Sequence, residues 1–218
     1  MGGMTAVRES AALARVPQEE RSRVMRQRLL DATVECLVEQ GWSGTSTTLV
    51  SQRAGVSRGA QLHHFPTKND LVIAAVEHLS EKRAHDLRAA VVDLPAGKRR
   101  TRAVLDTLAD NFTSPVFTAA LELWVAARTD PNLQQAVGPL ERRVGREIHR
   151  HTVQLLDVDE TEPGVRELVQ ATLDLVRGLG LANTISDDTK RRRRILDRWA
   201  RVLDEQLHPN TADHEAAR

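Results

Sequence analysis

The sequence is poor in cysteine, aromatic residues and long apolar runs, which are features of secreted and membrane proteins. It contains one cysteine, Cys36, so no disulfide can form within the chain, which suits a reducing compartment. Tyrosine is absent, and aromatic residues make up only 3% of the 218 residues. No apolar run approaches the roughly 18 residues that a membrane span needs, and the first residues lack the apolar stretch of a signal peptide. We therefore expect a soluble protein of the cytoplasm with no membrane partner.

The motifs of common catalytic classes are missing too. The sequence has no glycine-rich phosphate loop, no Gly-x-Ser-x-Gly nucleophile turn and no His-Glu-x-x-His zinc motif. His63 and His64 are adjacent, so on a helix their side chains point about 100° apart and make a poor pair of metal ligands. We therefore expect neither an enzyme nor a bound cofactor or metal ion. Cys36 stands among apolar neighbours and is interpreted as a buried thiol.

The residues that are abundant favour helices. Hydrophobic residues make up 40% of the chain and charged residues 28%, the balance of an ordinary globular protein. No segment alternates as a half-buried strand does, so the composition and pattern predict an all-α protein. The formal net charge of +1 gives no argument for nucleic acid. Any such argument must rest on where the basic residues lie.

Glycine, proline and capping residues divide the chain into four parts. We predict a flexible arm at 1–16, a three-helix domain at 17–66, a larger helical domain at 67–208 and a loose tail at 209–218. The breakers and caps predict helices from Pro17 to a stop at Gly41 and then at 47–54, 58–65, 67–94, 98–112, 115–128, 131–156, 163–184 and 187–207.

The two short helices at 47–54 and 58–65 form the pattern of a helix-turn-helix. Ser46 and Ser57 suit the N-caps, and Gly55 breaks the chain between the helices. Because a major groove accepts a helix only where small side chains let the backbone approach, the second helix is predicted to read DNA. Its outward residues are small, polar or basic, namely Arg58, Gly59, Ala60, His63 and His64. Corners of this kind also occur in helical proteins that bind no DNA, and the pattern alone leaves that alternative open.

Residues 26–72 resemble the DNA-binding domain of TetR-family regulators. The resemblance rests on LLDATVECLVEQG, AGVS, HHFPTK and the following NDL, which occur in order and at the right spacing. It implies a three-helix DNA-binding domain followed by a larger helical domain for ligand binding and dimerisation. It also implies a sequence-specific regulator of transcription, a repressor that a small-molecule effector releases from a near-palindromic operator in double-stranded DNA.

The resemblance assigns roles to particular residues. It implies contacts of Thr47, Thr48 and Lys68 with phosphates. Leu62 stands where the family usually has tyrosine, so a phosphate-binding hydroxyl is missing, and Gln61 stands where the family usually has leucine and is expected to be partly buried. The residues expected at the DNA are Thr47, Thr48, Ser57, Arg58, Gly59, Ala60, Leu62, His63, His64 and Lys68. Contacts with flanking DNA and a solvated helix face are both open for Arg15, Arg21, Arg23, Arg26 and Arg28.

The middle of the larger domain carries most of the large side chains, which suits an apolar ligand pocket. Plain core packing explains the same spacing, so that alternative stays open. Two interpretations are open for His149 and His151, polar anchors in such a pocket or residues of the surface, and we expect them at the surface. The predicted pocket residues are Leu105, Leu108, Phe112, Phe117, Leu121, Trp124, Val144 and Ile148.

The last two predicted helices carry apolar stripes that suit a dimer interface. In the family that the chain resembles, the final two helices pair across a two-fold axis as a four-helix bundle, which implies a homodimer. Gly178 and Gly180 are expected to allow close approach there, and the basic run 190–194 is interpreted as a solvated helix start. The predicted interface residues are Leu168, Leu175, Leu179, Ile195, Trp199 and Val202. A helical DNA-binding or architectural dimer that senses no ligand is the alternative function.

Overall fold

The computed structural model describes residues 18–90, 94–95 and 98–207, and over these residues it contains helices and no strand. The all-α prediction is confirmed. The predicted arm at 1–16, Pro17, residues 91–93 of the predicted fourth helix and the tail at 209–218 lie outside the described residues.

Four helices make up the N-terminal part of the chain. They are α1 (Gln18–Gly44), α2 (Thr47–Ala54), α3 (Arg58–His64) and α4 (Lys68–Ala90). Three caps form as the sequence predicts, because each oxygen accepts a backbone N–H that has no partner within its helix. The Ser46 hydroxyl accepts from Leu49 N and begins α2, and the Ser57 hydroxyl accepts from Ala60 N and begins α3. Thr67 and Asp70 bond each other reciprocally ahead of α4.

Five helices follow in the described residues. They are α5 (Lys98–Phe112), α6 (Pro115–Ala127), α7 (Pro131–Leu156), α8 (Val165–Ala182) and α9 (Thr189–Leu207). Ser114 and Asp130 cap α6 and α7, and each of these helices begins with a proline, which has no N–H to leave unpaired. Pro139 lies inside α7, which nevertheless runs as one helix.

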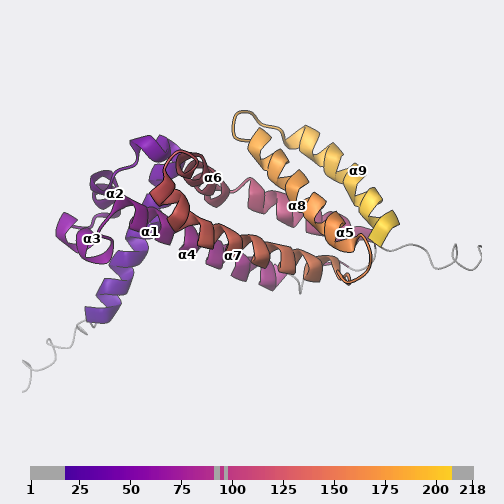
Figure 1. Ribbon diagram of the computed structural model, residues 1–218, viewed down its shortest axis with the longest axis horizontal. Coiled ribbons are helices and arrows are strands. Elements are labelled where there is room, and N and C mark those ends of the chain that lie inside the picture. The colour runs from indigo at the N-terminus through magenta and orange to yellow at the C-terminus, as the bar shows by residue number, and fades with distance from the viewer. Residues whose placement is uncertain (1–17, 91–93, 96–97, 208–218) are drawn as a thin grey trace, which may run out of the picture.

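The helices are arranged along one long axis (Figure 1). α1, α2 and α3 gather at one end, and α8 and α9 lie at the other. α4 and α7 pack against each other and run lengthwise between the two ends. None of the described helices is both long and apolar enough to cross a membrane.

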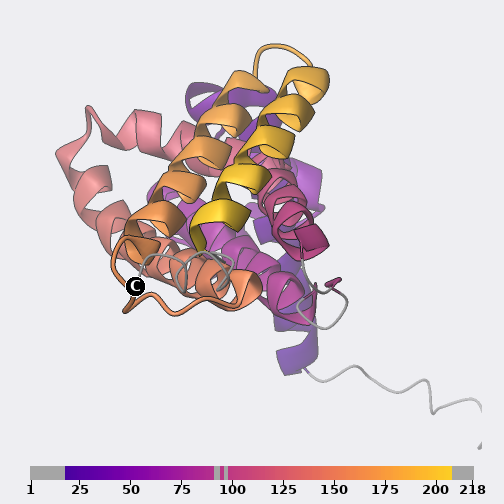
Figure 2. The same ribbon diagram turned by 90° about the vertical axis from the view of Figure 1, so that its right-hand side faces the viewer.

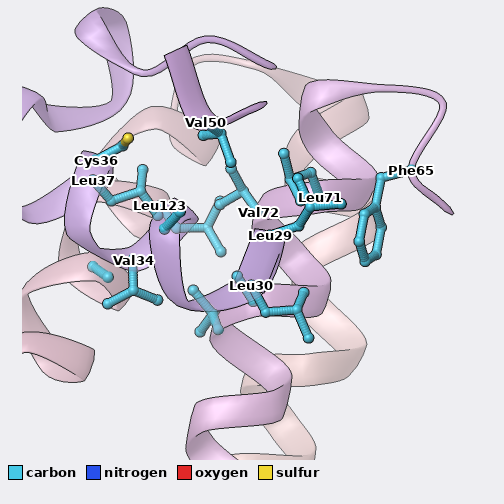
Figure 3. Packing of buried hydrophobic residues seen from close by; sticks show 14 of the residues in the cluster. Leu29, Leu30, Val34, Cys36, Leu37, Val50, Phe65, Leu71, Val72 and Leu123 are labelled. Atoms are coloured by element: carbon cyan, nitrogen blue, oxygen red, sulfur yellow. The ribbon is translucent and has the colours of Figure 1, made fainter. Parts of the chain in front are cut away.

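The buried apolar residues form two cores. The first core is built from the four N-terminal helices together with parts of α6 and α7. In Figure 3, Leu123 of α6 lies among side chains of the N-terminal helices. The second joins α5, α8 and α9 with Phe117 of α6 and the end of α7. Trp124 packs against both. The N-terminal helices therefore share their core with α6 and α7, so the division between the cores does not follow a boundary at residue 66.

Candidate nucleic-acid interface and cavity

The turn between α2 and α3 directs one face of α3 outwards. Gly55 adopts φ 64° and ψ 34°, a left-handed conformation that glycine reaches without strain, and its N–H bonds Gln52 O. Val56 follows and is buried in the first core, and Phe65 is buried at the other end of α3. The helix is thereby held at both ends, and its opposite face remains exposed.

The exposed face of α3 has an open backbone and a charged residue without a partner. A Cβ atom added to Gly59 would meet nothing within 4 Å, so another surface can come close there. Arg58 is exposed in the first turn and makes no hydrogen bond or ion pair with any described residue. Ser57 and His63 are exposed, whereas Ala60 is half-buried. The Ser57 hydroxyl oxygen accepts the Ala60 N–H as the cap of α3.

Gln61 is turned away from this face. It is fully buried, with 0% of its surface exposed, and its Nε2 donates to Phe65 O at 2.6 Å. Its Oε1 has no hydrogen-bond partner. The sequence predicts that Gln61 is partly buried, and the structure buries it completely. Gln61 therefore anchors the end of α3 and cannot reach a base.

The other predicted contact residues lie around α3. Thr48 is exposed at the start of α2, Thr47 beside it is half-buried, and Leu62 leaves 45% of its surface exposed on α3. His64 is half-buried. Burial first, and then the charges of His63 and Arg26, lower the pKa of His64.

The arginines of α1 divide into two groups. Arg23 pairs with Glu20, and the guanidinium of Arg26 lies 5.4 Å from the centroid of the Phe65 ring. Arg21 and Arg28 are exposed and pair with no described residue. Together with His63 and His64 they line a groove between α1 and α3. This groove extends the positive surface beyond α3. Arg15 lies outside the described residues.

Lys68 begins α4 and is half-buried against α1. Its ammonium donates to the carbonyl of Trp42 at 2.5 Å and lies 4.1 Å from the centroid of the Trp42 ring. Burial lowers the pKa of Lys68. The residue that the resemblance assigns to phosphate therefore has contacts within its own chain.

A cavity lies where the two cores meet. It offers about 80 Å³ to the centres of water-sized molecules. Five of the predicted pocket residues line it, namely Phe112, Phe117, Trp124, Val144 and Ile148. Phe117 stands edge-on to Phe112 and to Trp124, with ring centroids 5.4 and 6.2 Å away. Aromatic and aliphatic walls of this kind suit an apolar ligand.

Three predicted pocket residues lie elsewhere. Leu105 and Leu108 are buried in the second core, because α5 turns this face towards α8 and α9. Leu121 is half-buried on α6 and does not line the cavity. Sequence reasoning missed the contributions of α4 and α8 and part of the contributions of α5, α6 and α7, since helical spacing reports a buried face but not the faces that share a void. The missed apolar residues are Val76, Val116, Ala120, Leu123, Val137 and Leu140, and the missed polar ones include Ser80, Asn111, Glu141, Glu147 and Arg177.

The surface prediction for His149 and His151 is wrong. The side chain of His149 is 12% exposed and its Nε2 bonds Glu160, while His151 is 4% exposed. The sequence places them on α7, but the chain after α7 folds back and brings Glu160 over His149. The prediction for Cys36 holds, because it is buried in the first core, and burial raises the pKa of its thiol.

α8 and α9 lie side by side and together form one face of the molecule (Figure 2). Among the predicted interface residues, Leu168, Leu175, Ile195, Trp199 and Val202 are half-buried. Leu179 is buried in the second core of its own chain. Leu175, Ile195 and Trp199 line a hollow on this face together with Arg191, Arg194 and Arg198.

Gly178 and Gly180 differ in what surrounds them. A Cβ atom on Gly180 would overlap the backbone carbonyl of Phe112, so this glycine serves a close approach within the chain. A Cβ atom on Gly178 would meet nothing within 4 Å. The basic run at 190–194 begins α9, where Arg191 pairs with Asp188. The described residues contain no group of three metal-ligating side chains.

Comparison with known proteins agrees with this geometry. The family model for bacterial regulatory proteins of the tetR family matches residues 29–75, from α1 to the first part of α4. The chain is 32% identical over 184 residues to the HTH-type transcriptional regulator CymR of Pseudomonas putida, across 82% of this chain and 88% of CymR.

Solved structures share the fold. A transcriptional regulator from Rhodococcus sp. Rha1 has a TM-score of 0.64 and 24% identity, over 83% of this chain and 96% of that one. The multidrug binding protein EbrR, solved in complex with imidazole, has a TM-score of 0.53 and 25% identity, over 80% of this chain and 93% of EbrR.

Proposed function

Since the chain belongs to the TetR family of bacterial regulatory proteins, which are DNA-binding transcriptional regulators, we propose that it is a homodimeric repressor released from a near-palindromic operator by a small molecule. The observation that carries this proposal is the outward face of α3, where Arg58 has no partner and Gly59 leaves the backbone open. A regulator of bacterial genes works beside the chromosome, so the proposed location is the cytoplasm.

In this proposal α3 enters the major groove and Arg58 contacts a base edge. An arginine can donate two parallel hydrogen bonds to guanine, which is the commonest specific contact of this kind. Thr48, His63 and the α1 residues Arg21 and Arg28 stand around α3 and suit the phosphates on either side. Lys68 stays a proposed phosphate contact, because its ammonium has three donors and the bond to Trp42 uses one.

The proposed dimer forms through the face of α8 and α9. One helix-turn-helix grips DNA weakly, so two copies are needed for a stable complex, and a two-fold dimer matches a palindrome. The hollow of Leu175, Ile195 and Trp199 supplies an apolar centre ringed by arginines. Ile185, in the turn that joins α8 to α9, leaves 94% of its surface exposed.

The effector is proposed to bind in the cavity between the two cores. Its walls come from α4, α5, α6, α7 and α8, and α4 leads directly to the recognition helix. A ligand that prefers one arrangement of these helices shifts the position of α3. The name of EbrR, a multidrug binding protein, agrees with ligand binding in this fold. The cavity therefore favours a sensor over a dimer that senses no ligand.

The first test selects operators from random duplexes with the purified protein. We expect inverted half-sites with centres roughly 10 base pairs, or a multiple of that, apart. On the selected operator, Arg58→Ala weakens binding by about 1–3 kcal/mol and leaves binding to random DNA unchanged. Arg146→Ala is the control, because Arg146 is exposed on α7 and pairs with no described residue. Equal losses on operator and random DNA would remove Arg58 from the base contacts.

The second test asks whether the cavity controls release. A library of apolar compounds is screened for release of the labelled operator from the wild-type protein. Ala120→Leu narrows the cavity and is expected to bind the operator but resist release, whereas Val125→Leu, exposed on the same helix, behaves as wild type. If the compounds release the operator from Ala120→Leu as readily as from the wild type, the effector binds elsewhere.

A further inference from the structure

α6 contacts both the cavity and the end of α1. Ala120, Leu123 and Trp124 line the cavity. Glu122 stands between these residues in the sequence but does not line the cavity, and its Oε2 instead accepts a hydrogen bond from the backbone N–H of Trp42 at 2.8 Å. This bond joins residues that are 80 positions apart. One short segment of α6 thus contacts both the cavity and the end of α1, the helix that packs against α2 and α3.

The contact depends on a glycine at the end of α1. Gly41 has φ 64° and ψ −177°, which interrupts the helix and is a conformation that only glycine adopts readily. A Cβ atom on Gly41 would lie 2.9 Å from Glu122 Oε2. The absence of a side chain therefore lets the carboxylate approach, and the turn directs the next N–H, that of Trp42, at its oxygen.

Trp42 is also bound by α4. The backbone carbonyl of Trp42 accepts a hydrogen bond from Lys68 Nζ, and the backbone N–H of Trp42 donates one to Glu122. Lys68 begins α4, and α3 ends at His64, only a few residues earlier. The backbone of Trp42 therefore links the cavity helix α6 to the chain that holds the recognition helix.

We propose that Glu122 is a positioning residue for operator binding. By holding Trp42, it sets the orientation of α1 and of the attached α2 and α3 relative to α6. A charged acceptor that is partly buried holds such a bond more firmly than a neutral one. A shift of α6 caused by a ligand in the cavity then reaches the DNA-binding helices through this bond. The inference rests on the proposed function, since it concerns how the cavity and α3 communicate.

Two substitutions separate the hydrogen bond from the space that the side chain fills. Glu122→Gln keeps an oxygen acceptor of the same reach, and Glu122→Leu keeps a similar volume without an acceptor. Glu162→Leu is the matched control, because Glu162 is exposed and its carboxylate bonds no described residue. Each full-length variant is tested for binding to the operator selected by the wild type and to a random duplex. Melting temperature and hydrogen exchange of the Trp42 amide are measured beside them.

The expected pattern is specific. Glu122→Leu binds the operator about ten-fold more weakly, the order of one hydrogen bond to a charged group, and its Trp42 amide exchanges faster. Its binding to random DNA changes little, and its melting temperature falls by only a few degrees, because a single hydrogen bond is lost. Glu122→Gln restores most of the operator affinity, and Glu162→Leu behaves as wild type.

Other outcomes overturn the proposal. If Glu122→Leu binds the operator as wild type does, Glu122 positions nothing. If operator and random-DNA binding fall together with the melting temperature, its role is only structural. If the wild type itself prefers no sequence, the proposed function fails first, and the exchange of the Trp42 amide still reports whether Glu122 holds α1.

Discussion

Lys68 and Trp42 are joined twice. The ammonium donates to the Trp42 carbonyl at 2.5 Å and lies 4.1 Å from the centroid of its ring. A cation over an indole ring is attracted by the negative face of the aromatic system. The pair fastens the start of α4 to the end of α1, so a residue expected to touch phosphate also stabilises the fold.

Replacing Lys68 by alanine is therefore expected to have two effects. The free energy of unfolding falls by about 1–2 kcal/mol, because the hydrogen bond and the cation–π contact are both lost. Affinity for operator and random DNA falls alike, and the slope of log K against log salt becomes shallower by about one unit. Denaturant unfolding and salt titrations measure the two effects.

The control is Lys82→Ala, since Lys82 is exposed on the same helix and pairs with no described residue. It should change neither quantity. If Lys68→Ala loses stability but keeps the wild-type salt slope, Lys68 acts only within the chain.

Gln61→Leu is expected to leave the protein as stable as wild type or stabilise it by about 1 kcal/mol. The variant loses the bond to Phe65 O but also removes a buried Oε1 that has no partner, and an unpaired buried group costs roughly 1–3 kcal/mol. Gln61→Glu should destabilise, because it places a charge in the same buried position. Thermal unfolding measures the stability of both variants against that of the wild type. A large loss in Gln61→Leu would mean that the amide contributes more than its single bond.

Gly180 and Gly178 form a matched pair on α8. Gly180→Ala forces a methyl group into the Phe112 backbone and should cost about 1–3 kcal/mol or more. Gly178→Ala meets open space and should stabilise the subunit by about 0.5–1 kcal/mol through helix propensity. If Gly178 lies in the proposed dimer interface, the same change weakens dimerisation, which sedimentation reports separately. Similar unfolding energies for the two variants would contradict the close approach at Gly180.

Glu160 gives the stability a dependence on pH. A hydrogen bond from His149 first, and then the charges of His149 and Arg166, hold the pKa of Glu160 below its usual 4.5. The unfolded chain therefore binds more protons, so this contribution is present above pH 4.5 and is lost as the pH falls through the folded pKa.

Glu160→Gln should accordingly be less stable than wild type near neutral pH, and the difference should shrink in acid. Urea unfolding at about pH 7 and about pH 3 compares the two proteins. Glu162→Gln, two residues away and without a side-chain partner among the described residues, should show no such trend. A difference that stays constant with pH would mean that the charge of Glu160 is not what stabilises the loop.

Many helix boundaries followed from the sequence. Ser46 and Ser57 stand one residue before α2 and α3, and Gly55 stands one residue after α2. Caps and left-handed glycines act within three or four residues of the chain, so their signals are complete in the sequence. The helix-turn-helix could be predicted for the same reason.

Contacts between distant segments were decided by tertiary structure alone. Helical spacing indicates that Leu105 and Phe112 are buried, and both lie in the second core, yet only the packing of α5 brings Phe112 and not Leu105 to the cavity. Nothing near Glu122 in the sequence points to Trp42, which lies 80 residues away. Local hydrogen bonding defines where helices begin and end, whereas the choice of which faces meet depends on non-local packing, and a periodic pattern does not encode that choice.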